Sequence, residues 1–125
     1  MAKSDETGGN REITIFHNPN CSTSRKALQM IRDAGAEPKV VEYLKTGWTR
    51  PQLEGLLARM GKRPRDILRV RGTPAEELGL TRPDASDDEI LDAMTQHPVL
   101  VERPIVASAK GVALGRPVEA IQPLL

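Results

Sequence analysis

The stretch ITIFHNPNCSTSRKALQMIRDAGAEPKVVEY, residues 13–43, decides the fold. Its first four residues, ITIF at 13–16, are β-branched or aromatic and are typical of a short buried strand. Apolar residues then recur at helical spacing as far as Gly35, which we expect to cap the helix end. KVVEY, residues 39–43, predicts a second strand. Together these pieces predict a βαβ unit with parallel strands and a right-handed crossover.

The middle of the chain carries three capping signals, which predict a helical insert over about residues 48–98. TRPQ (49–52) and SDDE (86–89) each place a hydroxyl three residues before a Gln or Glu, which is the capping-box pattern. Pro98 disfavours helix at the residue before it and is expected to end the segment that SDDE begins. A further signal of this kind, TPAE (73–76), predicts another helix between them.

The last part of the chain returns to strand patterns. PIVA (104–107) and VAL (112–114) flank SAKG and predict a β-hairpin with Gly111 in its turn. The segment from Pro117 onwards allows a short closing helix. A βαβ unit followed by a ββα unit around a four-stranded mixed sheet is the thioredoxin-like α/β arrangement. We therefore expect a single domain of this class over residues 12–125, with the helical insert inside it.

Composition narrows the class of protein. Lys and Arg total 18, Asp and Glu total 17, and the net charge is +1, so neither nucleic acid nor a membrane surface is an expected partner. The polar, Gly-rich start, residues 1–11, is expected to be a disordered lead-in without a signal peptide. A single cysteine fits a reducing cytoplasm. We expect a monomer.

Cys21 is that single cysteine, and it stands where the first strand gives way to the helix. A helix N-terminus presents unpaired N–H groups and positive potential, which stabilise a thiolate and attract oxyanions. The hydroxyls of residues 22–24 and the side chains of His17 and Arg25 lie nearby in sequence. The alternative is that Cys21 is a small buried apolar residue. No metal is expected, because one cysteine and two histidines form no ligand spacing.

Two arginines stand out by their context. Arg103 and Arg116 each directly precede a proline and flank a predicted strand, so their positions could bring them to the same sheet end as Cys21. The basic stretch between residues 59 and 71 is expected to be mostly solvated surface, because no aromatic residues interleave with it as they do in single-strand nucleic-acid sites.

HNPNCSTSR, residues 17–25, resembles the H-x3-C-x3-R active-site loop of the glutaredoxin-coupled arsenate reductases, the ArsC family. The resemblance continues in order through further segments and covers roughly residues 13–125. These segments are MIRDAGAEPKVVEYLKTG, ILRVRG, EELGL, MTQHPVLVERPIV and LGRP.

The resemblance implies a set of site residues. Cys21 matches the family's nucleophile, and the family's three oxyanion-binding arginines fall on Arg69, Arg103 and Arg116. The supporting positions are His17 near the thiolate, Ser24 and Arg25 in the loop, and Pro104, whose bond to Arg103 resembles the cis-proline of thioredoxin-like folds.

The resemblance also implies a reaction, the reduction of arsenate to arsenite. The Cys21 thiolate would attack arsenic(V), glutathione would attack the adduct, and glutaredoxin would supply the second external thiol. No internal resolving cysteine and no bound cofactor are then required, and glutathione is a co-substrate. The chain's end soon after the closing helix, the hairpin and ALGRP (113–117) resemble a shorter branch of the family, for which another oxyanion is an alternative substrate. The loop residues Asn20 and Ser22 also differ from those of the best-known reductases of the family.

Other functions remain open at this point. Redox regulators of the Spx type share the fold and bind RNA polymerase, but they commonly carry C-x-x-C, and here Ser24 occupies the second cysteine position. Cysteine phosphatases use C-x5-R, and here Ala27 occupies the arginine position. In a non-catalytic binding module, replacement of Cys21 by serine would leave function intact.

Overall fold

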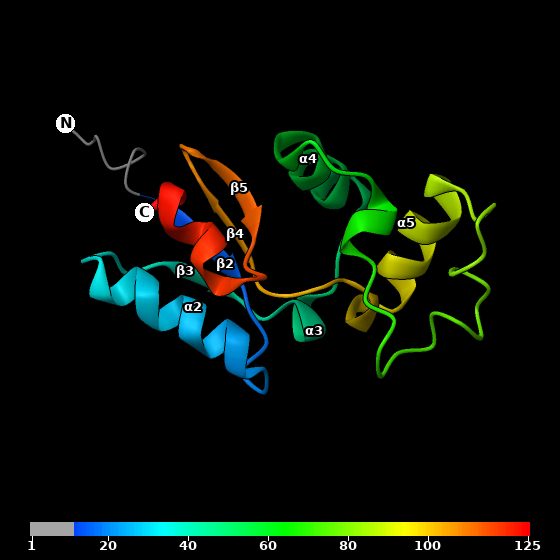
Figure 1. Ribbon diagram of the computed structural model, residues 1–125, viewed down its shortest axis with the longest axis horizontal. Helices are drawn as coiled ribbons and strands as arrows, with labels where there is room; N and C mark the ends of the chain where they lie inside the picture. Colours follow the sequence, from blue (N-terminus) through cyan, green and yellow to red (C-terminus); the bar gives the residue numbers. More distant parts are fainter. Residues whose placement is uncertain (1–11) are drawn as a thin grey trace. The chain divides into compact units, whose positions relative to one another are not determined.

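The computed structural model describes residues 12–125, so the predicted lead-in at 1–11 lies outside the described residues. The chain divides into two compact units (Figure 1). The first combines the chain up to Glu42 with Arg103–Leu125, and the second is Tyr43–Glu102, which contains the predicted helical insert. No helix among the described residues is long and apolar enough to cross a bilayer.

The first unit is built on a four-stranded mixed sheet in the order β3-β2-β4-β5. β2 and β3 are parallel, whereas β2 pairs antiparallel with β4 and β4 pairs antiparallel with β5. This confirms the predicted βαβ and ββα arrangement. The elements are β2 (Ile13–Phe16), α2 (Ser22–Asp33), β3 (Lys39–Val41), β4 (Ile105–Ser108), β5 (Gly111–Leu114) and the 3₁₀ helix η3 (Val118–Leu124).

One face of this sheet is covered by α2 and η3 together. Ile15 of β2 and Val106 of β4 are paired across the sheet and are both fully buried. They pack with Ala27 and Ile31 of α2 and Ile121 of η3 in one apolar cluster. Burial of such aliphatic side chains stabilises the fold by about 1.5–3 kcal/mol for each large residue. The cluster fixes the position of α2 and therefore of its N-terminus.

The second strand is shorter than predicted, because KVVEY leaves the sheet after Val41. β2 ends at Phe16, which pairs with Val41, and the His17 N–H then donates to the Val41 carbonyl at 2.8 Å. Beyond this point Glu42 has no residue of β2 opposite it, and Tyr43 begins a short helix.

The C-terminal elements confirm the hairpin and refine its details. Gly111 is the first residue of β5, paired with Ser108, and the turn lies between them. The predicted Gly111 turn position was therefore wrong by one residue. The closing helix begins after Pro117 as predicted, but it is a 3₁₀ helix. Pro123 has no N–H to donate, which weakens α-type bonding there.

The second unit is helical, and the outer capping predictions are confirmed. Thr49 with Gln52, and Ser86 with Glu89, form capping boxes at the starts of α4 and α5. α5 ends at Gln96, ahead of Pro98. The elements are α3 (Tyr43–Thr46), α4 (Arg50–Met60), the 3₁₀ helix η1 (Pro64–Ile67), α5 (Asp87–Gln96) and the 3₁₀ helix η2 (Pro98–Leu100).

The predicted helix at TPAE (73–76) is absent, and turns take its place. The Thr73 hydroxyl accepts from the Ala75 N–H, one residue too early for a capping box. It also donates to the Arg69 carbonyl at 2.7 Å. Gly79, at φ +75°, ends the segment after a single turn. One turn is too short to offset the cost of nucleating a helix.

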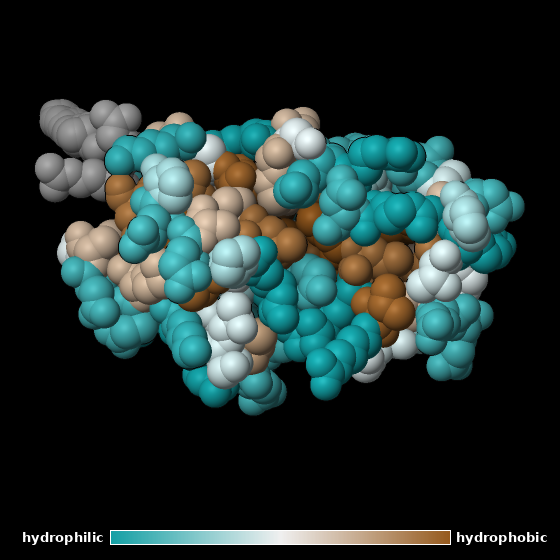
Figure 2. All heavy atoms as spheres, viewed as in Figure 1, coloured by the Kyte–Doolittle hydropathy of each residue, from teal (hydrophilic) through white to brown (hydrophobic). Residues whose placement is uncertain are grey.

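Ion pairs join α4 to α5. The Arg50 guanidinium bonds Asp92 at 2.8 Å and also Asp88, and both acids lie on α5. Hydrogen bonds to these carboxylates raise the pKa of Arg50, whose side chain is 32% exposed. In Figure 2 the surface around α5 is mostly hydrophilic, in line with these charges.

Ser86→Ala tests the cap of α5. The Ser86 hydroxyl accepts from the Glu89 N–H at 3.1 Å, and loss of an N-cap costs about 1 kcal/mol. We expect urea denaturation to give a free energy of unfolding lower by about that amount. Thr81→Ala, an exposed position outside the caps, should change it by less than about 0.5 kcal/mol. Equal values for the two variants would contradict the assigned cap.

Candidate functional site

Cys21 is the N-cap residue of α2 and is partly exposed. Its backbone is extended, with φ −100° and ψ 121°, as is usual for an N-cap residue. The Cys21 N–H donates to the Asn18 carbonyl at 3.0 Å, and the Cys21 carbonyl accepts from the Arg25 N–H at 3.0 Å. The sulfur therefore lies at the first turn of the helix, as predicted, on a loop held by hydrogen bonds on both sides.

His17 and Ser24 form a buried pair behind this loop. His17 Nδ1 and Ser24 Oγ are hydrogen-bonded at 2.6 Å, and Ser24 Oγ also accepts from the Asn18 N–H at 3.1 Å. Ser24 is fully buried, and His17 and Asn18 are almost so. Burial lowers the pKa of His17, an effect that nearby Glu42 opposes and Arg25 adds to. A neutral imidazole at neutral pH follows, so the ring orders the loop through Ser24.

The pKa of Cys21 lies below its ordinary value. Burial alone would raise the pKa, but hydrogen bonds to the thiolate outweigh it. These come from the Ser24 backbone N–H, the Arg103 side chain and the Thr23 backbone N–H, and the Arg103 charge adds to them. The predicted donors, the hydroxyls of residues 22–24, include Ser24, whose hydroxyl is instead committed to the buried pair.

Arg103 enters the site from the chain just before β4. The Arg103–Pro104 bond is cis, as the sequence predicts. Nε and Nη1 of Arg103 are buried and have no hydrogen-bond partner among the described residues. Since unpaired buried donors cost free energy, these nitrogens are suited to an external acceptor with several oxygens.

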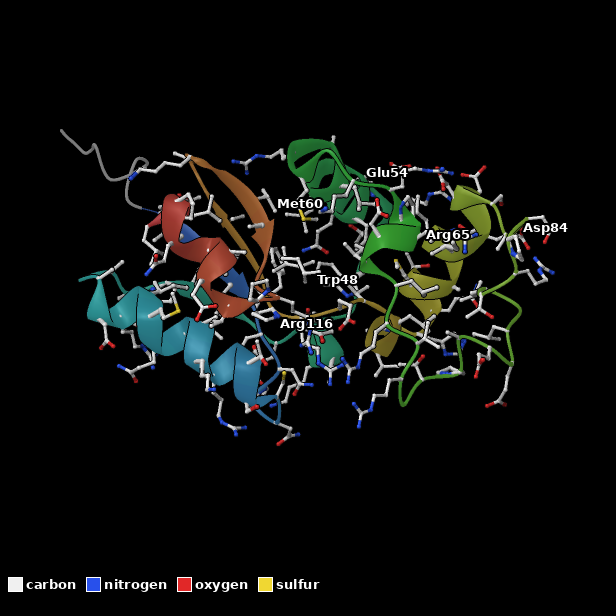
Figure 3. The ribbon with its side chains drawn as sticks, in the orientation of Figure 1. Trp48, Glu54, Met60, Arg65, Asp84 and Arg116 are labelled. Atoms are coloured by element: carbon white, nitrogen blue, oxygen red, sulfur yellow. The ribbon has the colours of Figure 1, made fainter. Side chains whose placement is uncertain are left out.

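Arg116 and Arg25 belong to the same unit as Cys21. Arg116, labelled in Figure 3, follows β5 and donates from Nη1 to the Arg103 carbonyl at 3.1 Å. It is exposed, so most of its guanidinium remains accessible. Arg25 donates to the Pro19 carbonyl at 2.8 Å and so closes the loop on its exposed side.

Arg69 lies in the second unit. Its Nη1 donates to Glu102 Oε1 at 2.9 Å, and its backbone N–H donates to the Leu100 carbonyl at 2.7 Å. The other predicted site residues all belong to the first unit: Cys21, His17, Ser24, Arg25, Arg103, Pro104 and Arg116.

Two residues that hydrogen-bond to the predicted loop or site residues were not predicted from the sequence. Asn18 orders the loop through its side chain as well, since its Oδ1 accepts from the Asn20 N–H at 2.9 Å. Glu102, which directly precedes Arg103, accepts a hydrogen bond from Arg69 that no local sequence pattern indicates. The helical register offered a signal for Ser24: it shares the buried face of α2 with Ala27 and Ile31, where a polar residue requires a partner.

The site contains groups suited to nucleophilic attack and to anion binding. A stabilised thiolate lies beside a guanidinium with unused donors, which suits attack on a bound oxyanion. Among residues 12–125, no group of three or more His, Cys, Asp or Glu side chains is arranged to hold a metal ion.

Comparison with known proteins supplies independent findings. The family model described as the ArsC family matches residues 16–124. The arsenate reductase ArsI2 of Synechocystis sp. is 52% identical over 113 residues, which cover 90% of this chain and 81% of that protein. The arsenate reductase of Escherichia coli K12 is 48% identical, with 90% and 80% coverage. A solved arsenate reductase from Vibrio cholerae superposes with a TM-score of 0.87 at 35% identity, covering 92% and 98%.

Arg103→Ala is expected to raise the pKa of the Cys21 thiol, because it removes both a hydrogen bond and a positive charge from the thiolate. The measurement is the pH dependence of Cys21 alkylation by iodoacetamide. The midpoint should move to higher pH in the variant. Arg71→Ala, an exposed position in the second unit, should leave it in place, and an unmoved midpoint in Arg103→Ala would contradict the contact.

His17→Asn and His17→Leu separate a positioning role of His17 from a charge role. Asparagine can keep a hydrogen bond to Ser24 Oγ near the Nδ1 position, whereas leucine cannot. The same alkylation titration should give a near-normal thiol pKa for His17→Asn and a raised one for His17→Leu. An equal rise in both would indicate that an imidazolium charge stabilises the thiolate.

Proposed function

The chain belongs to the ArsC family, and on that premise we propose that it is a thiol-dependent arsenate reductase. The observation that carries the proposal is the placement of Arg103, which lowers the pKa of the Cys21 thiol and whose Nε and Nη1 are buried without a hydrogen-bond partner among the described residues. The arsenate reductases that resemble it at 48–52% identity over 90% of the chain support the choice of substrate.

Arg69, Arg103 and Arg116 bind the oxyanion in this proposal. Guanidinium groups bind two oxygens at once, and three of them offset the negative charge that would otherwise repel a thiolate. Arg103 and Arg116 are linked through the Arg103 carbonyl. Four further residues support the loop without contacting arsenic, namely Pro104, His17, Ser24 and Arg25.

The first step is substitution at arsenic. Cys21 Sγ attacks arsenic(V), a sulfur–arsenic bond forms, and one arsenate oxygen leaves as water after protonation. Arsenic is not reduced in this step. The lowered pKa of Cys21 raises the fraction of thiolate available at neutral pH.

Two external thiols then supply the electrons. Glutathione displaces a second oxygen as water and forms its own sulfur–arsenic bond. The thiol of glutaredoxin attacks the glutathione sulfur, so a disulfide forms and the electron pair of the broken bond reduces arsenic to the trivalent state. Water releases arsenite and restores the Cys21 thiol. Overall, one arsenate and two thiols give one arsenite, one disulfide and one water.

The proposed setting follows from this chemistry. Glutathione and glutaredoxin are external partners, no cofactor is bound, and a reducing cytoplasm keeps Cys21 as a thiol. The protein is proposed to act as a monomer, and the proposed site requires residues from one chain only.

The test of the function is arsenate-dependent oxidation of NADPH in the presence of glutathione, glutathione reductase and glutaredoxin. We expect turnover by the native protein and none by Cys21→Ser. Alanine at Arg69, Arg103 or Arg116 should lower kcat/KM at least about tenfold, since each removes a charge-assisted bond of about 1.5–3 kcal/mol. Arg71→Ala should behave like the native protein.

Folded native protein with no activity above Cys21→Ser, tried with several glutaredoxins, would refute the function. Native kinetics in the three arginine variants would refute only their assignment.

A further inference from the structure

Arg69 and Glu102 lie on one face of a β-bridge between two segments of the second unit. Leu68 and Val101 form an isolated antiparallel bridge. On one side of it the Arg69 N–H donates to the Leu100 carbonyl at 2.7 Å, and on the other the Glu102 N–H donates back across the bridge at 2.8 Å. In this register the two side chains are diagonal neighbours, within reach of each other.

The side chains form an ion pair that is largely shielded from water. Arg69 Nη1 and Glu102 Oε1 are 2.9 Å apart, and the side chains are only 18% and 23% exposed. The Arg63–Asp87 pair of the same unit is 72% and 46% exposed. Solvent therefore screens the Arg69–Glu102 attraction less than it screens an ordinary surface pair.

The contact uses only part of the arginine. Within residues 12–125, Nη1 is the one guanidinium nitrogen of Arg69 with a hydrogen-bond partner. A guanidinium has five N–H donors in a fixed plane, so the remaining edge can still bind an anion. An anion bound there would also lie close to the Glu102 carboxylate, which repels it.

From this geometry, and resting on the proposed function for the role of Arg69, we propose that Glu102 is a positioning residue that also limits oxyanion affinity. It holds the Arg69 fork in one orientation through Nη1, and its negative charge opposes the charge of the bound anion. The Arg69–Glu102 pair, and not Arg69 alone, then sets how tightly arsenate is held. Arsenite is uncharged at neutral pH, so the repulsion acts on the substrate and not on the product.

Glu102→Gln separates the two effects, because the amide oxygen can still accept from Nη1 while the charge is lost. We expect the KM for arsenate to fall about three- to tenfold, with kcat changed by less than about twofold. Glu102→Thr removes both the charge and the reach to Nη1, so its KM should lie between those of Glu102→Gln and the native protein.

The route through Arg69 is tested in a second background. In Arg69→Ala, Glu102→Gln and Glu102→Thr should lower KM by the same factor, because the charge effect remains but no fork is left to be positioned. Glu76→Gln, an exposed acid of the same unit, should behave like the native protein. Thermal melts check that each variant is folded.

The inference is overturned if Glu102→Gln leaves KM unchanged or raises it while the native protein is active. A difference in KM between Glu102→Gln and Glu102→Thr that persists without Arg69 overturns the positioning part. An equal fall in Glu102→Thr overturns the positioning part. Should Glu102→Gln fail to fold, Glu102→Thr alone must lower KM.

Calorimetric titration with inorganic arsenate separates this inference from the proposed function. If the native protein does not reduce arsenate, the function fails, but the Kd for arsenate should still be lower in Glu102→Gln. Equal affinities, or no binding to either protein, would reject the role of Glu102.

Discussion

The groups that lower the pKa of Cys21 connect the fold to the chemistry, because they come from two different parts of the first unit. The N–H groups of Thr23 and Ser24 belong to the first turn of α2, and the guanidinium of Arg103 belongs to the segment that leads into β4. A thiolate at this position therefore depends on the register of a helix and of a strand that are far apart in sequence. Without these donors, burial would raise the pKa of Cys21 and lower the fraction of thiolate.

The rest of the first unit keeps those donors in place. The apolar cluster of β2, α2, β4 and η3 fixes the helix against the sheet. At the helix N-terminus, Ser24 is buried and its hydroxyl is hydrogen-bonded to His17 and to the backbone of Asn18. These bonds fix the position of the loop relative to the helix. The neutral histidine favoured by burial fits this arrangement, because it provides a hydrogen bond without adding a buried charge. Electrostatic activation of the cysteine thus comes from Arg103 and the helix N–H groups.

Much of this could be predicted from sequence where the signal is local. The capping boxes at Thr49 and Ser86 depend on residues three apart, and both were found. TPAE follows the same capping-box pattern. Its Thr73 hydroxyl donates to the Arg69 carbonyl instead, a contact that the local pattern does not include. The end of the second strand was missed because its length is set by the partner, β2, and not by its own residues. Glu102 was missed because its hydrogen-bond partner, Arg69, lies 33 positions away in the sequence.

The central claim, that the folded protein lowers the pKa of Cys21, is tested most directly by titrating the thiolate's ultraviolet absorbance in the native and the urea-unfolded protein. Cys21 is the only cysteine, so one transition reports on it. A lower pKa in the folded state means that folding is favoured more strongly as pH rises from the folded-state pKa towards the unfolded-state value, and that this contribution is lost as pH falls through the folded-state pKa. We predict a native midpoint at lower pH than the unfolded one. A native midpoint equal to or above the unfolded one would contradict the account.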